Sequence, residues 1–262
     1  MPVMPLDSHA TLRIAAFQRK PLFDKLPATL ARLAHDLRWC DEHGVDVAVF
    51  PECYLQGYSS DSKTLARRAI SLDDACMMQL LSALATTRVT CLLGLVERRS
   101  ELLYNSVAVI RQGEILGVYS KSHPNEAAFT AGLDFPVFEV RNWRFGINIC
   151  NDANFAAPAR RLGEQGASLL CYPLNNMLLP ATADKWRQKS LENLQQRAID
   201  TGCWVISADV VGQHGEQIAH GCTCLFSPDG QVRLRVAEGQ EGVVVADITG
   251  KDLCTEYRHA RE

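Results

Sequence analysis

Short apolar runs alternate with helix-like segments along nearly the whole chain, and this alternation constrains the fold more than any other feature. The first run, TLRIAAFQ at residues 11–18, predicts a buried strand. Residues 27–44 follow, where leucines at helical spacing predict a helix that ends at Gly44. A second apolar strand, DVAVFPE, is expected at residues 46–52. The chain therefore begins with a strand, a helix and a strand.

The same two kinds of segment continue toward the C-terminal end. Further helices are predicted at residues 71–88, 157–166 and 183–202, with strands at 89–97, 104–121, 135–150, 167–173 and 203–211 and a meander at 221–248. Hairpin turns are predicted at Gln112-Gly113, Arg141-Asn142 and Asp229-Gly230. This mixture predicts an α/β fold with mixed sheets covered by helices. Because no linker or internal repeat divides the chain, we expect residues 1–262 to form a single domain.

Composition and charge argue against several kinds of partner. The chain has a formal net charge of −3 and no block of five or six like charges, so we expect no nucleic-acid partner. No segment approaches the ~18 apolar residues of a membrane span, and the N-terminus lacks a basic stretch before an apolar run. We therefore expect no membrane association and a cytoplasmic location. The ten cysteines are scattered without any C-x-x-C pair, which predicts reduced core thiols and no metal site.

Three local patterns place reactive side chains where a predicted strand ends, which is where mixed α/β folds usually hold their functional groups. In the first pattern, the strand DVAVF runs into Pro51 and Glu52. Apolar neighbours could hold Glu52 out of water, a setting that suits a general base. A solvated loop glutamate is the alternative interpretation of this segment.

In the second pattern, Lys121 lies at the end of a predicted strand, before a loop rich in Pro, Asn and Gly. This lysine could be an exposed charge that guards the strand edge, or a cation aimed at a developing oxyanion. A histidine in such a loop, as His123 is, more often caps the loop or packs against it than acts in catalysis. Glu126 is ambiguous on this pattern alone.

The third pattern, which is the strongest, ends a strand on Cys150 and turns through Asn151 and Asp152 into a helix. Unpaired backbone N–H groups at a helix start favour a thiolate. The arrangement resembles the strand-to-helix nucleophile elbow in its physical logic, although the G-x-S-x-G sequence is absent. The alternative is one more buried core cysteine, which is what we expect for the other nine.

Taken in order, these patterns resemble the nitrilase-like carbon–nitrogen hydrolase superfamily. The motifs that carry the resemblance are F-P-E, Y-x-K-x-H, I-C-x-D with A-R-x-L in the next helix, and a tryptophan with Q-x-R-A-I-x-x-x-C. The similarity extends from TLRIAAFQ to HGCTCLFSPDGQV and so covers nearly the whole chain. It implies an α-β-β-α sandwich that pairs into a homodimer or a higher homo-oligomer.

The resemblance assigns a catalytic triad to Glu52, Lys121 and Cys150. Glu52 would take the thiol proton as Cys150 attacks a carbonyl carbon. Lys121 and the backbone N–H of Asn151 would stabilise the resulting oxyanion. A water activated by Glu52 would then hydrolyse the thioester, so we expect no cofactor. Members of the family often carry a second glutamate after the lysine, and Glu126 is the candidate for that substrate-binding position.

The residues after the nucleophile depart from two groups of relatives. Residues 150–152 read C-N-D, whereas nitrile-cleaving members typically read C-W-E or C-G-E, so amide-type chemistry is expected. The triplet is similar to that of N-carbamoyl-D-amino-acid hydrolases, but Ala153 and Asn154 stand where those enzymes have two arginines. A neutral pair cannot form the bidentate contacts of a carboxylate clamp. Asn175 and Asn176 are expected to line the pocket, unless they only form a turn.

The expected substrate is therefore a small amide or N-carbamoyl compound. The alternatives are nitrile hydrolysis on the same triad, a catalytically silent binding subunit of the same fold, a Cys-His hydrolase and a metal-binding module. None of the seven histidines lies in a motif that would support a Cys-His pair with Cys150.

Overall fold

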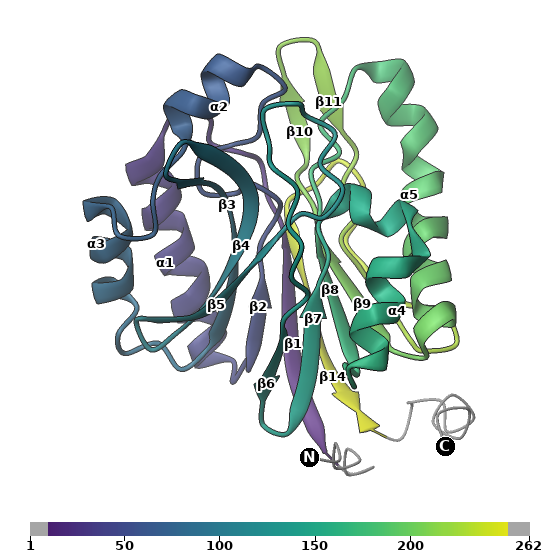
Figure 1. Cartoon of the computed structure of the whole chain (residues 1–262). Helices are drawn as coiled ribbons and strands as arrows, with labels where there is room; N and C mark the ends of the chain where they lie inside the picture. Colours follow the sequence, from purple (N-terminus) through teal and green to yellow (C-terminus); the bar gives the residue numbers. More distant parts are fainter. Residues whose placement is uncertain (1–9, 251–262) are drawn as a thin grey trace.

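The computed structural model describes residues 10–250, which form two six-stranded sheets packed face to face and a separate small hairpin (Figure 1). The first sheet has the strand order β14-β1-β2-β3-β4-β5. Its strands are β1 (Thr11–Gln18), β2 (Val47–Val49), β3 (Thr90–Arg99), β4 (Leu102–Arg111), β5 (Glu114–Ser120) and β14 (Gly242–Thr249). β2 pairs in parallel with β1 and β3, whereas the other neighbours pair antiparallel, so the sheet is mixed.

The second sheet has the strand order β13-β12-β9-β8-β7-β6. Its strands are β6 (Val137–Val140), β7 (Trp143–Ile147), β8 (Leu169–Pro173), β9 (Trp204–Ala208), β12 (Cys224–Phe226) and β13 (Val232–Arg235). β7, β8 and β9 are parallel and need helical crossovers, while antiparallel strands flank them on both sides. The small hairpin consists of β10 (Gly212–His214) and β11 (Gln217–Ala219).

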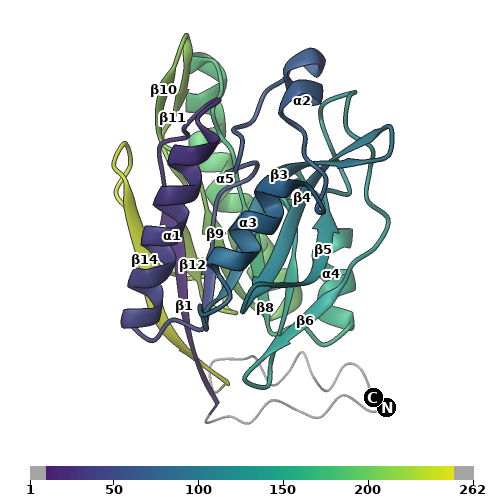
Figure 2. The same cartoon turned by 90° about the vertical axis from the view of Figure 1, so that its left-hand side faces the viewer.

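Helices cover the outer face of each sheet (Figure 2). The helices are α1 (Leu26–Glu42), α2 (Ser62–Arg68), α3 (Ala75–Ala83), α4 (Ala156–Glu164) and α5 (Pro180–Thr201). Leu33 and Leu37 of α1, two of the leucines whose spacing predicted this helix, are fully buried against the first sheet. Leu162 of α4 and Leu194 of α5 pack in the same way on the second sheet. No helix within residues 10–250 is both long and apolar enough to cross a bilayer.

The two sheets share one apolar core between them. Because side chains alternate between the faces of a strand, Ile14 of β1 points into this inner core while Ala15 joins the cluster under the helices. Ile14 belongs to the same buried cluster as Phe145 and Ile206 of the second sheet. The predicted α-β-β-α sandwich with mixed sheets is therefore confirmed.

Two of the predicted hairpin turns have the backbone that such turns require. Gln112 and Gly113, between β4 and β5, have φ angles of 50° and 76°, and Arg141 and Asn142, between β6 and β7, have φ angles of 47° and 66°. Two consecutive positive φ values match the twist of the flanking strands. The third predicted turn also separates two paired strands, β12 and β13.

The local structure differs from the prediction around Cys150, at α2 and at the hairpin of β10 and β11, which was not predicted. The strand that was expected to end on Cys150 ends at Ile147, and a 3₁₀ helix (Cys150–Asn154) replaces the expected turn. The sequence analysis also missed α2, a helix of 7 residues. Its start is marked by Asp61, whose carboxylate accepts the N–H of Thr64 as an N-cap.

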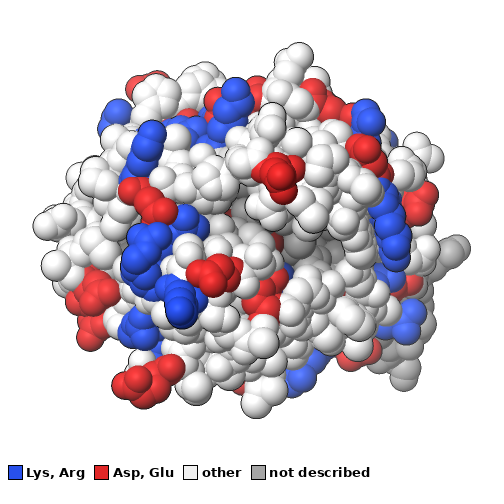
Figure 3. All heavy atoms as spheres, turned by 90° about the horizontal axis from the view of Figure 1, so that it is seen from above, with Lys and Arg blue, Asp and Glu red and all other residues white. Residues whose placement is uncertain are grey.

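The loops that carry the predicted site residues leave the same end of the sandwich. β3 is parallel to β2, and the two antiparallel pairings from β3 to β4 and from β4 to β5 make β5 point in the same direction as β2. β7 and β8 are parallel to each other. Glu52, Lys121, Cys150 and Asn175 follow these four strands in turn. Figure 3 looks onto this end, where the surface is hollowed. The carboxyl ends of strands are the usual place for ligand sites in such folds.

Candidate active site

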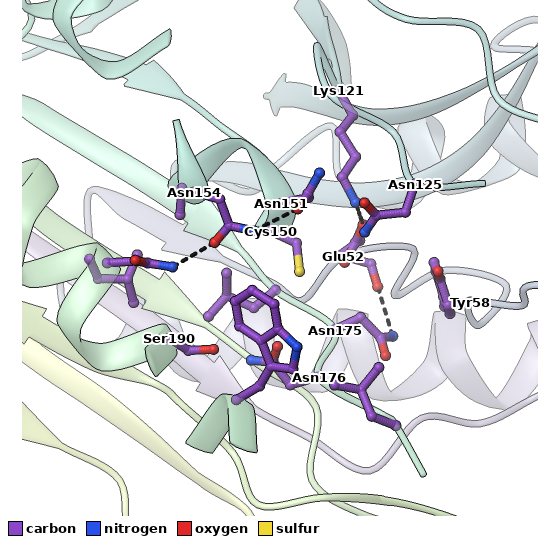
Figure 4. Close-up of a pocket in the computed structure, with 16 residues that line it drawn as sticks. Glu52, Tyr58, Lys121, Asn125, Cys150, Asn151, Asn154, Asn175, Asn176 and Ser190 are labelled. Atoms are coloured by element: carbon purple, nitrogen blue, oxygen red, sulfur yellow. Dashed lines mark hydrogen bonds and ion pairs between the residues drawn. The ribbon is translucent and has the colours of Figure 1, made fainter. Parts of the chain in front are cut away.

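A pocket of about 160 Å³ lies between the loops that follow β2, β5, β7 and β8 (Figure 4). Five of the six residues predicted for the site line this pocket: Glu52, Lys121, Cys150, Asn151 and Asn175. They span positions 52 to 175 of the sequence and are brought together by the two sheets. The sixth residue, Glu126, does not line the pocket.

Glu52 and Lys121 form a buried ion pair. Lys121 Nζ lies 2.6 Å from Glu52 Oε1, and the two side chains are 2% and 1% exposed. Burial alone would lower the pKa of Lys121, but the negative charge of Glu52 and the hydrogen bond to it favour the ammonium, and the pKa lies above its ordinary value. Lys121 is therefore a permanent cation. The alternatives of a solvated loop glutamate and an exposed edge lysine are both wrong.

Asn105 of β4 positions both members of this pair. Its side-chain N–H donates to Glu52 Oε1 at 2.6 Å, and its backbone carbonyl accepts the N–H of Lys121 at 2.8 Å. Gly94 of β3 lets the loop with Glu52 approach closely, since a Cβ at Gly94 would lie 2.2 Å from the carbonyl oxygen of Pro51. The sequence analysis missed Asn105, whose place in the middle of a strand gave no local signal.

Cys150 stands at a sharp bend between β7 and the 3₁₀ helix. Its φ of 40° lies in the left-handed region that residues other than glycine rarely adopt, and strain of this kind clusters at functional sites. The first N–H groups of a helix lack partners inside that helix. Among the described residues, none accepts the N–H of Asn151. This is the donor that the resemblance assigns to the oxyanion.

The surroundings of Cys150 favour the neutral thiol. Burial raises its pKa well above the ordinary value, and the negative charge of Glu52 raises it further. Lys121 and the backbone N–H of Asn175 lower the pKa without offsetting these two effects. The helix start favours a thiolate, as expected from the sequence, but burial and the charge of Glu52 oppose it. A neutral thiol needs a base before it can act as a nucleophile.

Asp152 ties the loop after Lys121 to the bend at Cys150. Its fully buried carboxylate accepts the N–H of Ile149 at 2.9 Å and the hydroxyl of Tyr119 at 2.8 Å. It also accepts the backbone N–H of His123 at 2.8 Å. The loops that carry Lys121 and Cys150 are thus held in register by one side chain.

His123 has a packing role, as the sequence analysis expected. Its ring contacts Ser122 and Asp152 and stacks on the ring of Phe155, with the centroids 4.0 Å apart. These contacts lend no support to a Cys-His pair. Within residues 10–250, no three His, Cys, Asp or Glu side chains gather in a way that could hold a metal ion.

Glu126 lies next to the pocket, in contact with one of its lining residues. The hydroxyl of Tyr58, which lines the pocket, donates to Glu126 Oε1, while Glu126 Oε2 is buried and has no partner among the described residues. Burial and then the charge of Glu52 raise the pKa of Glu126 to about 7. Direct substrate binding by Glu126 stays a prediction.

The sequence analysis also missed part of the pocket wall. Trp186, Ser190 and Asn193 line the pocket from one face of α5, at the i, i+4 and i+7 spacing of a helix. Asn176, which was expected in the pocket, lines it and donates through Nδ2 to Asp209 at 2.8 Å. From the sequence alone, the polar residues on this face of α5 could not be distinguished from residues that are exposed to solvent.

Comparison with known proteins supports the resemblance. The family model for carbon-nitrogen hydrolases matches residues 13–258. The chain is 32% identical to "Hydrolase in pqqF 5'region" from Pseudomonas protegens, over 91% of this chain and 83% of that protein. It is 24% identical to a nitrilase from Pyrococcus abyssi, over 90% and 89% of the two chains. An amidase from Nesterenkonia sp. has the same fold, with a TM-score of 0.80 at 21% identity over 98% of both chains.

The family model spans nearly the whole chain, from β1 past the end of β14. The chain therefore belongs to the carbon-nitrogen hydrolase family, the nitrilase-like enzymes that act on C–N bonds other than peptide bonds.

Proposed function

We propose that this enzyme hydrolyses a small amide or N-carbamoyl compound through a thioester on Cys150. The observation that carries the proposal is that Cys150 shares one pocket with the buried pair of Glu52 and Lys121. A thiol, a carboxylate and a fixed cation are the groups that attack on an amide carbonyl requires. The amidase and the nitrilase among the similar proteins support the same class of reaction.

In the first half-reaction, Glu52 takes the proton of Cys150 as the sulfur forms a bond to the carbonyl carbon. The carbonyl oxygen gains a negative charge, which the ammonium of Lys121 and the N–H of Asn151 stabilise. When this species collapses, the C–N bond breaks and the leaving nitrogen takes the proton from Glu52. Ammonia or an amine departs, and the acyl group remains on Cys150 as a thioester.

In the second half-reaction, a water attacks the thioester carbon while Glu52 takes one of its protons. Lys121 and the N–H of Asn151 stabilise the second oxyanion as they did the first. The C–S bond then breaks, the sulfur of Cys150 recovers its proton from Glu52, and the acid is released. The side chains return to their starting state.

The assembly rests on the resemblance alone, whereas the location and the single domain rest on the sequence pattern. A homodimer or higher homo-oligomer, a cytoplasmic location and a single domain over residues 1–262 stay predictions. Light scattering of the purified protein tests the assembly, and a mass equal to one chain would contradict it.

The reaction is tested by an ammonia-release assay over small primary amides, N-carbamoyl compounds and nitriles. We expect amides or carbamoyl compounds to be hydrolysed, and Cys150→Ala to reduce the rate to background. The control is Cys76→Ala, because Cys76 is also a half-buried free thiol but does not line the pocket. Undiminished turnover by Cys150→Ala would overturn the proposal, and turnover of nitriles alone would favour nitrile hydrolysis on the same triad.

A further inference from the structure

The pocket wall beyond the reacting centre is polar but carries no charge. Of the side chains that line the pocket, only those of Glu52 and Lys121 are charged at neutral pH, and they are paired with each other. Six asparagines and a serine supply most of the remaining polar groups. The substrate's non-reacting part therefore meets hydrogen-bonding groups without a counter-charge.

Three of these asparagines form a chain of hydrogen bonds. Asn151 donates through Nδ2 to the backbone carbonyl of His123 at 2.9 Å. Asn154 donates to Asn151 Oδ1 at 2.6 Å, and Asn193 donates to Asn154 Oδ1 at 2.5 Å. Dashed lines in Figure 4 mark the two bonds made by Asn154. A continuous chain of hydrogen bonds thus runs along the wall from Asn151, next to Cys150, to Asn193 on α5.

The direction of this chain is fixed at one end. A backbone carbonyl only accepts, so Asn151 must turn its NH₂ group toward His123 and its Oδ1 toward Asn154. The same constraint passes from Asn154 to Asn193. The chain therefore ends at Asn193 Oδ1, for which the structure shows no partner within the described part of the protein.

The helix α5 presents two further groups beside this oxygen. Ser190, one turn before Asn193, lines the pocket, and its hydroxyl has no partner among the described side chains and backbone groups (Figure 4). Trp186, a further turn away, adds a flat apolar surface to the same wall. An acyl group on Cys150 that fills this pocket would meet the apolar surface of Trp186 together with an acceptor oxygen and a hydroxyl.

We infer that the site selects an uncharged acyl group whose far end carries a hydrogen-bond donor, bound by Asn193 Oδ1 and Ser190. A carboxylate there would lose its hydration against a carbonyl oxygen, with no unpaired cation in the wall to offset the loss. An ammonium would likewise lack a counter-ion. The inference rests on the proposed amide hydrolysis and adds the substrate class to it.

The test compares three four-carbon primary amides that differ at the far end: succinamide, succinamate and butyramide. After correction for its two equivalent amides, we expect succinamide to exceed both others in kcat/KM by about tenfold, the effect of one lost hydrogen bond or of a poorly accommodated charge. A kcat/KM for succinamate or butyramide equal to or above that for succinamide would overturn the inference.

A pair of amide-to-leucine variants tests the assignment to Asn193. Asn193→Leu removes the terminal acceptor, so we expect the succinamide-to-butyramide ratio to fall to about one. Gln196→Leu is the matched control, because Gln196 is exposed on the same helix, bonds to Asp200 and lies outside the pocket. An undiminished ratio in Asn193→Leu would overturn the inference, and the comparison of substrates on the unmodified enzyme stands even if that variant does not fold.

The proposed function and the inferred substrate class would be contradicted by different results. If none of the three amides is hydrolysed, or if hydrolysis survives Cys150→Ala, the proposed function fails and the substrate class fails with it. If hydrolysis depends on Cys150 but shows no preference among the amides, the substrate class alone is wrong.

Discussion

Lys121 and Glu52 face each other across 2.6 Å inside the protein, each at most 2% exposed. Two charges taken out of water cost free energy, and their mutual attraction must offset that cost. Removal of one partner leaves an uncompensated buried charge. Substitutions of Glu52 and Lys121, which we place at the centre of catalysis, can therefore separate the effect of this pair on stability from its effect on activity.

Glu52→Gln tests the general base. The amide is nearly the same size as the carboxylate but cannot take a proton from the thiol or from water, so we expect turnover to fall by ~10²–10⁴ while the fold is kept. Activity assays and circular dichroism measure the two effects. The control is Glu97→Gln, since Glu97 is equally buried and paired with Arg99 but does not line the pocket. More than about a tenth of the original rate in Glu52→Gln would exclude this role.

Lys121→Met tests the fixed cation. Methionine has a similar length without charge, so turnover should fall by at least ~10², as for other lost oxyanion donors. Stability should fall by up to about 3–5 kcal/mol, because Glu52 is left buried and unpaired. Chemical denaturation of the double variant Lys121→Met/Glu52→Gln decides the cause, since removing both charges should restore part of the loss. A double variant less stable than Lys121→Met would speak against the ion-pair explanation.

Asp152→Asn tests the link between the two loops. The single amide oxygen cannot accept all the bonds that the buried carboxylate receives, and one lost partner costs roughly 1–3 kcal/mol. We expect a lower melting temperature together with a lower kcat, because the loops that carry Lys121 and Cys150 lose their register. Asp61→Asn is the control, since asparagine is an equally good N-cap for α2. Unchanged melting of Asp152→Asn would refute the linking role.

Glu126 makes stability depend on pH. Its pKa is raised from 4.5 to about 7, by burial first and then by the charge of Glu52, so folding favours the protonated carboxyl. This contribution is present below pH 4.5 and is lost as the pH rises through 7. We expect the free energy of unfolding to fall more steeply from pH 5 to 8 in the unmodified protein than in Glu126→Gln. Glu192→Gln, on the exposed side of α5, should keep the original slope, whereas parallel curves for all three proteins would contradict the shifted pKa.

Much of the fold could be predicted because local patterns agree with the tertiary structure. The spacing of Leu33 and Leu37 identified the buried face of α1, and the turn residues Gln112 and Gly113 identified a hairpin. The missed helix α2 is too short for its periodicity to stand out. The 3₁₀ helix at Cys150 depends on Asp152, a contact that strand and helix patterns do not describe.

The residues of the site can likewise be divided into those that the sequence could predict and those that it could not. Glu52, Lys121 and Cys150 could be found because each follows closely after a strand within a motif, and the structure gathers them in one pocket. Asn105 and Asn193 could not, because each acts through a partner more than thirty residues away in sequence. The protonation of Cys150 was also out of reach, since burial depends on the packing of both sheets.

The central claim, a thioester on Cys150, is tested most directly by mass spectrometry of the enzyme quenched in acid during turnover of an amide. We expect the intact mass to increase by that of the acyl group, and peptide mapping to place the addition on Cys150. The Cys150→Ala protein should show no addition. Amide hydrolysis during which the acyl group is found on another residue, or during which Cys150 stays unmodified, would contradict the account.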